Sequence, residues 1–146
     1  MISMSVAELM PVLQMAIGPV VLISGVGLLI NSLTNRMGRV VDRGRLIVGS
    51  LRDAPDQNRD TVSHQLKILS YRARLLRRSI LFAVLCMLFD ALLIITTFVI
   101  AALKVEMGWA IALLFAGALI SLVVALVIFL QELNQALIIF HQDIGE

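Results

Sequence analysis

The sequence predicts an all-α integral membrane protein with three transmembrane helices, in which long cytoplasmic extensions of the second and third helices form a hairpin. Three observations support this class. The chain of 146 residues is 60% hydrophobic, whereas soluble domains are about 45–50% apolar. The apolar residues gather into three blocks, each near the ~20 residues that cross ~30 Å of hydrocarbon. Positive charge is packed between the first two blocks, which is the positive-inside pattern. We expect one membrane domain over residues 1–146.

The first span is predicted over residues 11–33. Pro11 suits a helix start, where a missing N–H costs nothing, and Pro19 is expected to kink the helix. Residues 1–9 carry no Lys or Arg, so they lack the basic region of a signal peptide and are expected outside. Small and polar residues near one face favour close packing on another helix; they are Gln14, Gly18, Gly25 and Ser32.

Residues 34–78 form the predicted basic cytoplasmic region. Eleven of the twelve Lys and Arg residues lie here with four acids, so the region carries +7 and the rest of the chain −5. Its first part predicts an amphipathic helix that lies in the inner membrane interface or packs on a cytoplasmic helix of the same protein. The positive-inside pattern accounts for this charge, so we predict no nucleic-acid partner. Candidate contacts for anionic lipid or a protein partner are Arg36, Arg39, Arg43, Arg77 and Arg78.

One long helix is predicted from Asp60 to Leu103, because no helix breaker separates its polar start from the second span over residues 79–103. Apolar residues in its first part alternate at spacings of four and three, which predicts a coiled-coil-like seam. The seam comprises Val62, Leu66, Leu69, Ala73, Leu76 and Ile80.

The third span is predicted over residues 109–130 and begins at Trp109, an aromatic suited to the membrane interface. Gly117, Ser121 and Ala125 form a ladder of small residues, which predicts a packing face. The tail, residues 131–146, continues the helical period into the cytoplasm, antiparallel to the seam, and its acids Glu132, Asp143 and Glu146 would face the basic region. Its apolar stripe is Leu133, Leu137, Phe140 and Ile144.

The run Ala16–Ile47 resembles a bacterial family of small inner-membrane proteins, domain of unknown function 2721. The likeness rests on Ala-Ile-x-Pro at the start of the run, Ser-Gly-x-Gly at Ser24–Gly27, and Thr-Asn-Arg-x-x-Arg-x-x-Asp-Arg at Thr34–Arg43. The arginine pair that opens the second span fits as well. The resemblance implies a prokaryotic inner-membrane protein with about three spans. It implies no activity and no catalytic residues.

Asp90 lies near the middle of the second span and is the sharpest single-residue hypothesis. A carboxylate at this depth costs roughly 2.5–3.5 kcal/mol on insertion scales, so it should face helices or water. Intramembrane acids often mark ion or proton paths, and Gln14 and Asn31 would be the other polar residues of such a path. The alternative is an Asp90 that joins helices through a hydrogen bond to Asn31, Ser24 or Thr97.

An enzyme is the least supported class. The chain has no nucleotide-binding loop, no nucleophile elbow and no Cys or His cluster at metal-ligand spacing. His64 and His141 fall in the proposed extensions, where a site shared with Asp143 competes with the simpler interpretation of two solvated side chains. The single cysteine, Cys86, allows no intrachain disulfide. We predict no enzymatic activity, no cofactor and no metal.

Two function classes remain. One is an ion-conducting pore with Asp90 facing the path, which requires a homo-oligomer because three spans rarely enclose a pore. The other is a structural or regulatory scaffold that binds anionic lipid or a protein partner through its basic cytoplasmic hairpin. Both place the protein in the prokaryotic inner membrane, with the N-terminus outside and the C-terminus in the cytoplasm.

Overall fold

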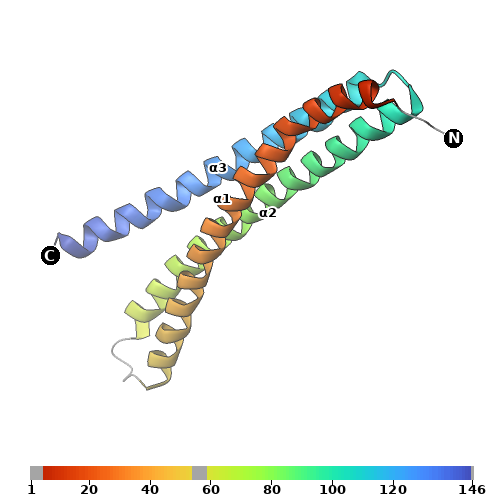
Figure 1. Cartoon of the computed structure of the whole chain (residues 1–146). Helices are drawn as coiled ribbons and strands as arrows, with labels where there is room; N and C mark the ends of the chain where they lie inside the picture. Colours follow the sequence, from red (N-terminus) through yellow and green to blue (C-terminus); the bar gives the residue numbers. More distant parts are fainter. Residues whose placement is uncertain (1–4, 54–58, 146) are drawn as a thin grey trace. The chain divides into compact units, whose positions relative to one another are not determined.

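The structure is a computed structural model that describes residues 5–53 and 59–145 (Figure 1). Three helices account for almost all of them, and the described residues contain no strand: α1 is Val6–Asp53, α2 is Arg59–Leu103 and α3 is Gly108–Ile144. Each helix is long and apolar enough to cross a membrane. The predicted all-helical class with three membrane-length helices is therefore confirmed.

The first helix begins at Val6, five residues earlier than the start expected at Pro11, so both Pro11 and Pro19 lie inside it. The reason is the glutamate half of a capping box. The Ser5 carbonyl accepts the N–H groups of Glu8 and Leu9, and the Glu8 side chain accepts the Ser5 N–H at 3.2 Å. A glutamate three residues after the capping serine satisfies one of the free N–H groups of a helix start, that of the serine itself, which favours a boundary there.

The second helix is a single rod from Arg59 to Leu103, as predicted from the absence of a breaker. It ends with Lys104 in the left-handed conformation, at φ 53°. The Val105 N–H donates to the Ile100 carbonyl at 3.4 Å, which is the wide closing bond of a Schellman-type helix end. Glycine usually takes this left-handed position, because a Cβ is strained there.

The chain divides into two compact units. Unit 1 is Met1–Ile30 with Phe82–Val124, and unit 2 is Asn31–Leu81 with Ala125–Glu146. The centre of unit 1 holds Ala83, Cys86 and Ala118, all without exposed surface. The centre of unit 2 holds Leu33 and Leu76. The buried Val26 of α1 belongs to unit 1 and the buried Ala125 of α3 to unit 2, so each helix contributes to both cores. Nearly all of the basic residues belong to unit 2.

Unit 1 exposes many large apolar side chains on the single chain. Leu28, Leu113 and Ile120 are each more than 60% exposed. A water-soluble protein rarely exposes apolar surface on this scale, whereas hydrocarbon is a suitable environment for it. The exposure pattern of unit 1 therefore indicates a membrane protein, in agreement with helix length.

Candidate functional site: an arginine groove above a buried glutamate

Glu132 is the centre of the charged part of unit 2. Its side chain lies on α3 and has no exposed surface, yet it accepts hydrogen bonds from two other helices. Arg36 of α1 donates from Nη1 to Oε2 at 2.8 Å. Arg72 of α2 donates to Oε1 from Nη2 at 2.8 Å and from Nε at 3.2 Å. One carboxylate therefore links all three helices of the unit.

The pairing is what allows the Glu132 carboxylate to be buried. An isolated buried carboxylate is strongly unfavourable, and charge-assisted hydrogen bonds from guanidinium groups offset its desolvation. The two arginines keep side-chain exposures of 29% and 21%, so their outer N–H groups remain in contact with solvent. The Arg36 guanidinium also lies 5.4 Å from the centre of the Phe129 ring, a cation–π arrangement that holds its plane.

A groove opens beside this ion cluster, with a volume of about 340 Å³. We call it the arginine groove. Its charged lining consists of four arginines, completed by three apolar side chains: Arg36, Arg39, Arg43, Arg72, Val40, Leu69 and Ala136. Three of the arginines come from one face of α1, since they are spaced by three and four residues. Arg39 and Arg43 form no ion pair with a described residue and are exposed.

A smaller cavity of about 200 Å³ adjoins the arginine groove and shares Arg43 and Arg72 with it. It adds His64 and Gln65 from α2 and Gln142 from α3. The polar side chains of this cavity can all donate hydrogen bonds, and its other lining residues are aliphatic. Among the described residues, no group of three or more His, Cys, Asp or Glu is placed to hold a metal ion.

Counting these charges gives the electrostatic character of the site. The arginine groove has four guanidinium groups, and the adjoining Glu132 is the one carboxylate paired with them, so about +3 is not neutralised by the described side chains. Guanidinium groups bind phosphate and carboxylate oxygens with a fixed two-pronged geometry. The arrangement is suited to binding an anion.

Asp90 occupies a different environment in unit 1. It has no exposed surface, and neither carboxylate oxygen has a hydrogen-bond partner among the described residues. Two of the donors proposed for it are used elsewhere: the Thr97 hydroxyl donates to the Leu93 carbonyl at 2.8 Å, and the Ser24 hydroxyl to the Val20 carbonyl. Gln14, which was predicted to share a polar path with Asp90, is exposed. The exposed Asn31 belongs to unit 2.

The small residues predicted to pack between helices fall into two groups. A Cβ added at Gly117 would lie 3.5 Å from the Phe89 ring, and Ser121 is 5% exposed, so both lie in packed interior. A Cβ added at Gly18 or Gly25 would meet nothing within 4 Å. Close packing at those two glycines would therefore have to come from a different molecule.

Of the predicted basic contacts, Arg36, Arg39 and Arg43 meet in the arginine groove, while Arg77 and Arg78 are exposed on α2 outside its lining. The acidic partner was only partly anticipated. Sequence analysis expects Glu132 to face the basic region, but it does not single out Glu132 as a buried centre. The missed signal is position: Glu132 comes two residues after a long apolar run, where an acid needs a partner. Asp143 and Glu146 lie outside the described side chains.

Most of the chain matches one known protein family. A family described as Protein of unknown function (DUF2721) matches residues 16–141. The chain belongs to this family. No curated protein and no solved structure matches the chain. The matched region includes the arginine groove and Glu132 but not the capping box at Ser5, so the charged site is part of the DUF2721 match.

Proposed function

We propose that this DUF2721 protein is a non-enzymatic membrane scaffold that binds the phosphate of anionic lipid headgroups in its arginine groove. The observation that carries the proposal is the groove itself. Four guanidinium groups line one cavity, and a single buried carboxylate, that of Glu132, forms ion pairs with two of them. We place the protein in the prokaryotic inner membrane, with the basic region on the cytoplasmic side, because of the charge asymmetry along the sequence.

The position of the groove along the helices supports a headgroup ligand. Arg36 lies three residues beyond the predicted end of the first span at Leu33, which is about 4.5 Å of helix rise. Glu132 lies two residues beyond Leu130, or about 3 Å. Both residues are therefore expected at the level where lipid phosphates begin, which favours a lipid phosphate over a ligand from bulk water.

The expected affinity for anionic lipid follows from the two arginines of the groove that form no ion pair with a described residue. Arg39 and Arg43 have no ion pair with a described residue, and basic residues near an anionic surface contribute about 1 kcal/mol each. Replacing both with glutamine should cost about 2 kcal/mol, or roughly a thirtyfold loss of affinity. The test is native mass spectrometry of the purified protein, counting bound phosphatidylglycerol and phosphatidylcholine with identical acyl chains. We expect the Arg39→Gln, Arg43→Gln variant to lose the phosphatidylglycerol preference.

A matched control is needed because any basic segment attracts anionic lipid. Lys67→Gln with Arg74→Gln removes the same charge from exposed positions of α2 outside the groove lining. We expect this control to change the lipid preference less than threefold. Equal losses in the two double variants would mean general attraction and would overturn the proposal. Displacement of lipid by millimolar inorganic phosphate, with the same variant dependence, would assign the groove to a soluble anion.

An ion-conducting pore remains the second candidate, and the buried Asp90 without a hydrogen-bond partner favours it. Because Asp90 has no exposed surface on the single chain, the path would have to run among the helices of unit 1 in each copy. The measurement is ion flux in proteoliposomes under several gradients. A pore predicts flux that falls in Asp90→Asn while helicity is retained, and wild-type vesicles without flux would remove this candidate.

A further inference from the structure

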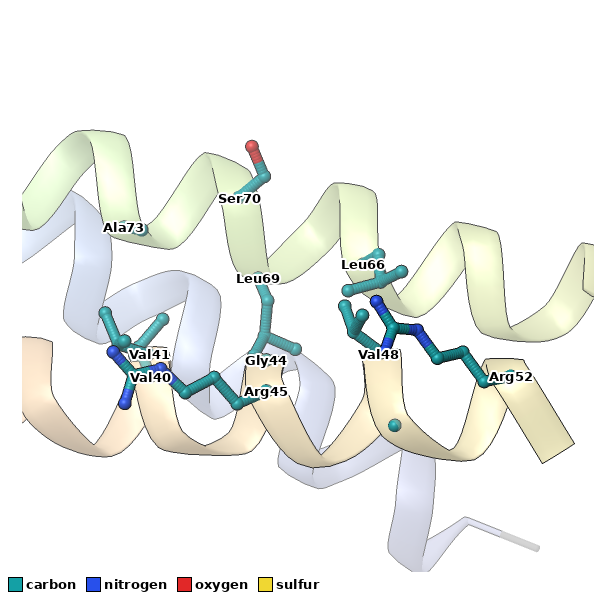
Figure 2. A pocket seen from close by; sticks show the side chains of 11 residues that line it. Val40, Val41, Gly44, Arg45, Val48, Arg52, Leu66, Leu69, Ser70 and Ala73 are labelled. Carbon is teal, nitrogen blue, oxygen red and sulfur yellow. The ribbon is translucent and has the colours of Figure 1, made fainter.

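A second groove lies between α1 and α2 in unit 2, with a volume of about 510 Å³ (Figure 2). We call it the apolar groove. Most of its side chains are aliphatic, and Arg45 and Arg52 of α1 extend along its edge. Gly44 and Gly49 line its α1 side as well and contribute no side chain there. The aliphatic lining is Val40, Val41, Val48, Leu66 and Leu69.

The tail of α3 presents an apolar surface of matching character. Leu137, Phe140 and Ile144 are 64%, 62% and 66% exposed, and their spacing of three and four puts them on one helix face. Sequence analysis expects this stripe against the seam of the second helix. In the structure the stripe is exposed, and the seam residues Leu66 and Leu69 line the apolar groove instead.

We propose that the apolar groove of one copy binds the α3 stripe of a second copy. Charge favours this occupant. After Glu132 the sequence contains two acids, Asp143 and Glu146, and no Lys or Arg. The groove has two arginines on its edge. A basic-edged apolar groove and an acidic apolar helix are complementary, which is the usual basis of helix-in-groove recognition.

The stripe and the groove also lie at similar distances from the expected membrane boundary. The groove runs from Val40 to Arg52, which is about 10 to 28 Å of helix rise beyond Leu33. The stripe runs from Leu137 to Ile144, about 10 to 21 Å beyond Leu130. Two copies inserted in the same orientation would therefore present these surfaces at the same distance from the membrane.

A second copy is a better occupant than the tail of the same chain. The opposite face of that tail is already used, since Ile139 and Gln142 line the small cavity beside the arginine groove. At 3.6 residues per turn, Phe140 and Ile144 point away from that cavity. In a two-fold pair the contact would be made twice, because the groove of each copy would hold the stripe of the other, so the interface would be isologous.

Disulfide trapping between two populations tests the contact. Both populations carry Cys86→Ala, which removes the one native thiol. One also carries Val48→Cys, in the apolar groove, and the other carries Phe140→Cys and a tag of different mass. After co-expression and mild oxidation in membranes, we expect a mixed disulfide dimer. The matched control replaces Val48→Cys with Leu46→Cys, because Leu46 is 76% exposed and does not line the groove.

The proposal predicts at least fivefold more mixed dimer with the Val48→Cys population than with the Leu46→Cys population. Equal yields, or monomers alone, would overturn it. A chain that carries both Val48→Cys and Phe140→Cys must also form dimers; intrachain closure would assign the groove to its own tail and overturn it too. Charge reversal by Arg45→Glu with Arg52→Glu should reduce the mixed dimer several-fold. These residues lie outside the arginine groove, so the lipid assay remains independent of this outcome.

Discussion

Replacing Glu132 with glutamine should destabilise the protein more than the same replacement at Glu8 or Glu106. Glu132 has no exposed surface and accepts three hydrogen bonds from Arg36 and Arg72. Glutamine keeps the shape of the side chain but removes its charge. Its single carbonyl oxygen can satisfy one arginine, and its amide would face the guanidinium of the other.

The size of the effect follows from these contacts. A hydrogen bond to a charged group contributes about 1.5–3 kcal/mol, and removing one partner of a buried ion pair costs about 3–5 kcal/mol. The arginines keep 29% and 21% side-chain exposure, so water can partly replace the lost carboxylate. We therefore expect a loss of about 2–4 kcal/mol in the free energy of unfolding. Replacement of all three charged residues by Met or Leu should restore most of this loss, because well-packed apolar groups often match a buried ion cluster.

The assay is unfolding in mixed detergent micelles, followed by the helical circular dichroism signal. Glu106→Gln is the matched control, since Glu106 is exposed and has no ion pair with a described residue. Surface changes of this kind usually stay within ±0.5 kcal/mol. If Glu132→Gln also stays within that range, the ion cluster does not hold the three helices of unit 2 together, and the reasoning is wrong.

Three smaller predictions use the same unfolding assay. Ser79→Ala should lose about 1 kcal/mol, because the buried Ser79 hydroxyl donates to the Ala125 carbonyl at 2.8 Å. Gly117→Leu should lose about 1–3 kcal/mol by overpacking against Phe89, whereas Gly117→Ala makes an ordinary contact and should be nearly neutral. Lys104→Gly should gain about 1 kcal/mol by relieving the left-handed strain, since its ion pair with Glu8 is long and exposed. A change of the opposite sign in the free energy of unfolding of a variant would contradict the argument for that variant.

The sequence was sufficient for the helices because long apolar blocks and the missing breaker before Ser79 act locally. It was less reliable at the first boundary. Pro11 is a strong signal for a helix start, but the Glu8 side chain accepts the Ser5 N–H, and the helix begins at Val6, five residues before Pro11. A Ser-x-x-Glu pattern is visible in the sequence, so the physical reason for the difference is that a cap determines a helix start more strongly than a proline does.

The site was harder to predict because it depends on which helix faces meet. The spacing of Arg36, Arg39 and Arg43 predicts one basic face on α1, and that face lines the groove. Nothing in a local pattern shows that Arg72 and Glu132 come to the same place, since they are 60 residues apart and lie on different helices. The exposed stripe at Phe140 illustrates the same limit: its periodicity predicts an apolar face but not the surface that covers it.

The arginines of the groove have two proposed functions, joining helices and binding an anion, and the partner of each arginine indicates which function it has. Arg36 and Arg72 already neutralise Glu132, so their first role is to join helices. Arg39 and Arg43 line the same cavity, and no described residue forms an ion pair with either of them. Packed like charges without a partner oppose folding, and a bound anion is the simplest way to offset that repulsion. Anionic lipid should therefore raise the unfolding free energy of the wild type more than that of the Arg39→Gln, Arg43→Gln variant, which links the stability of the charged site to its ligand.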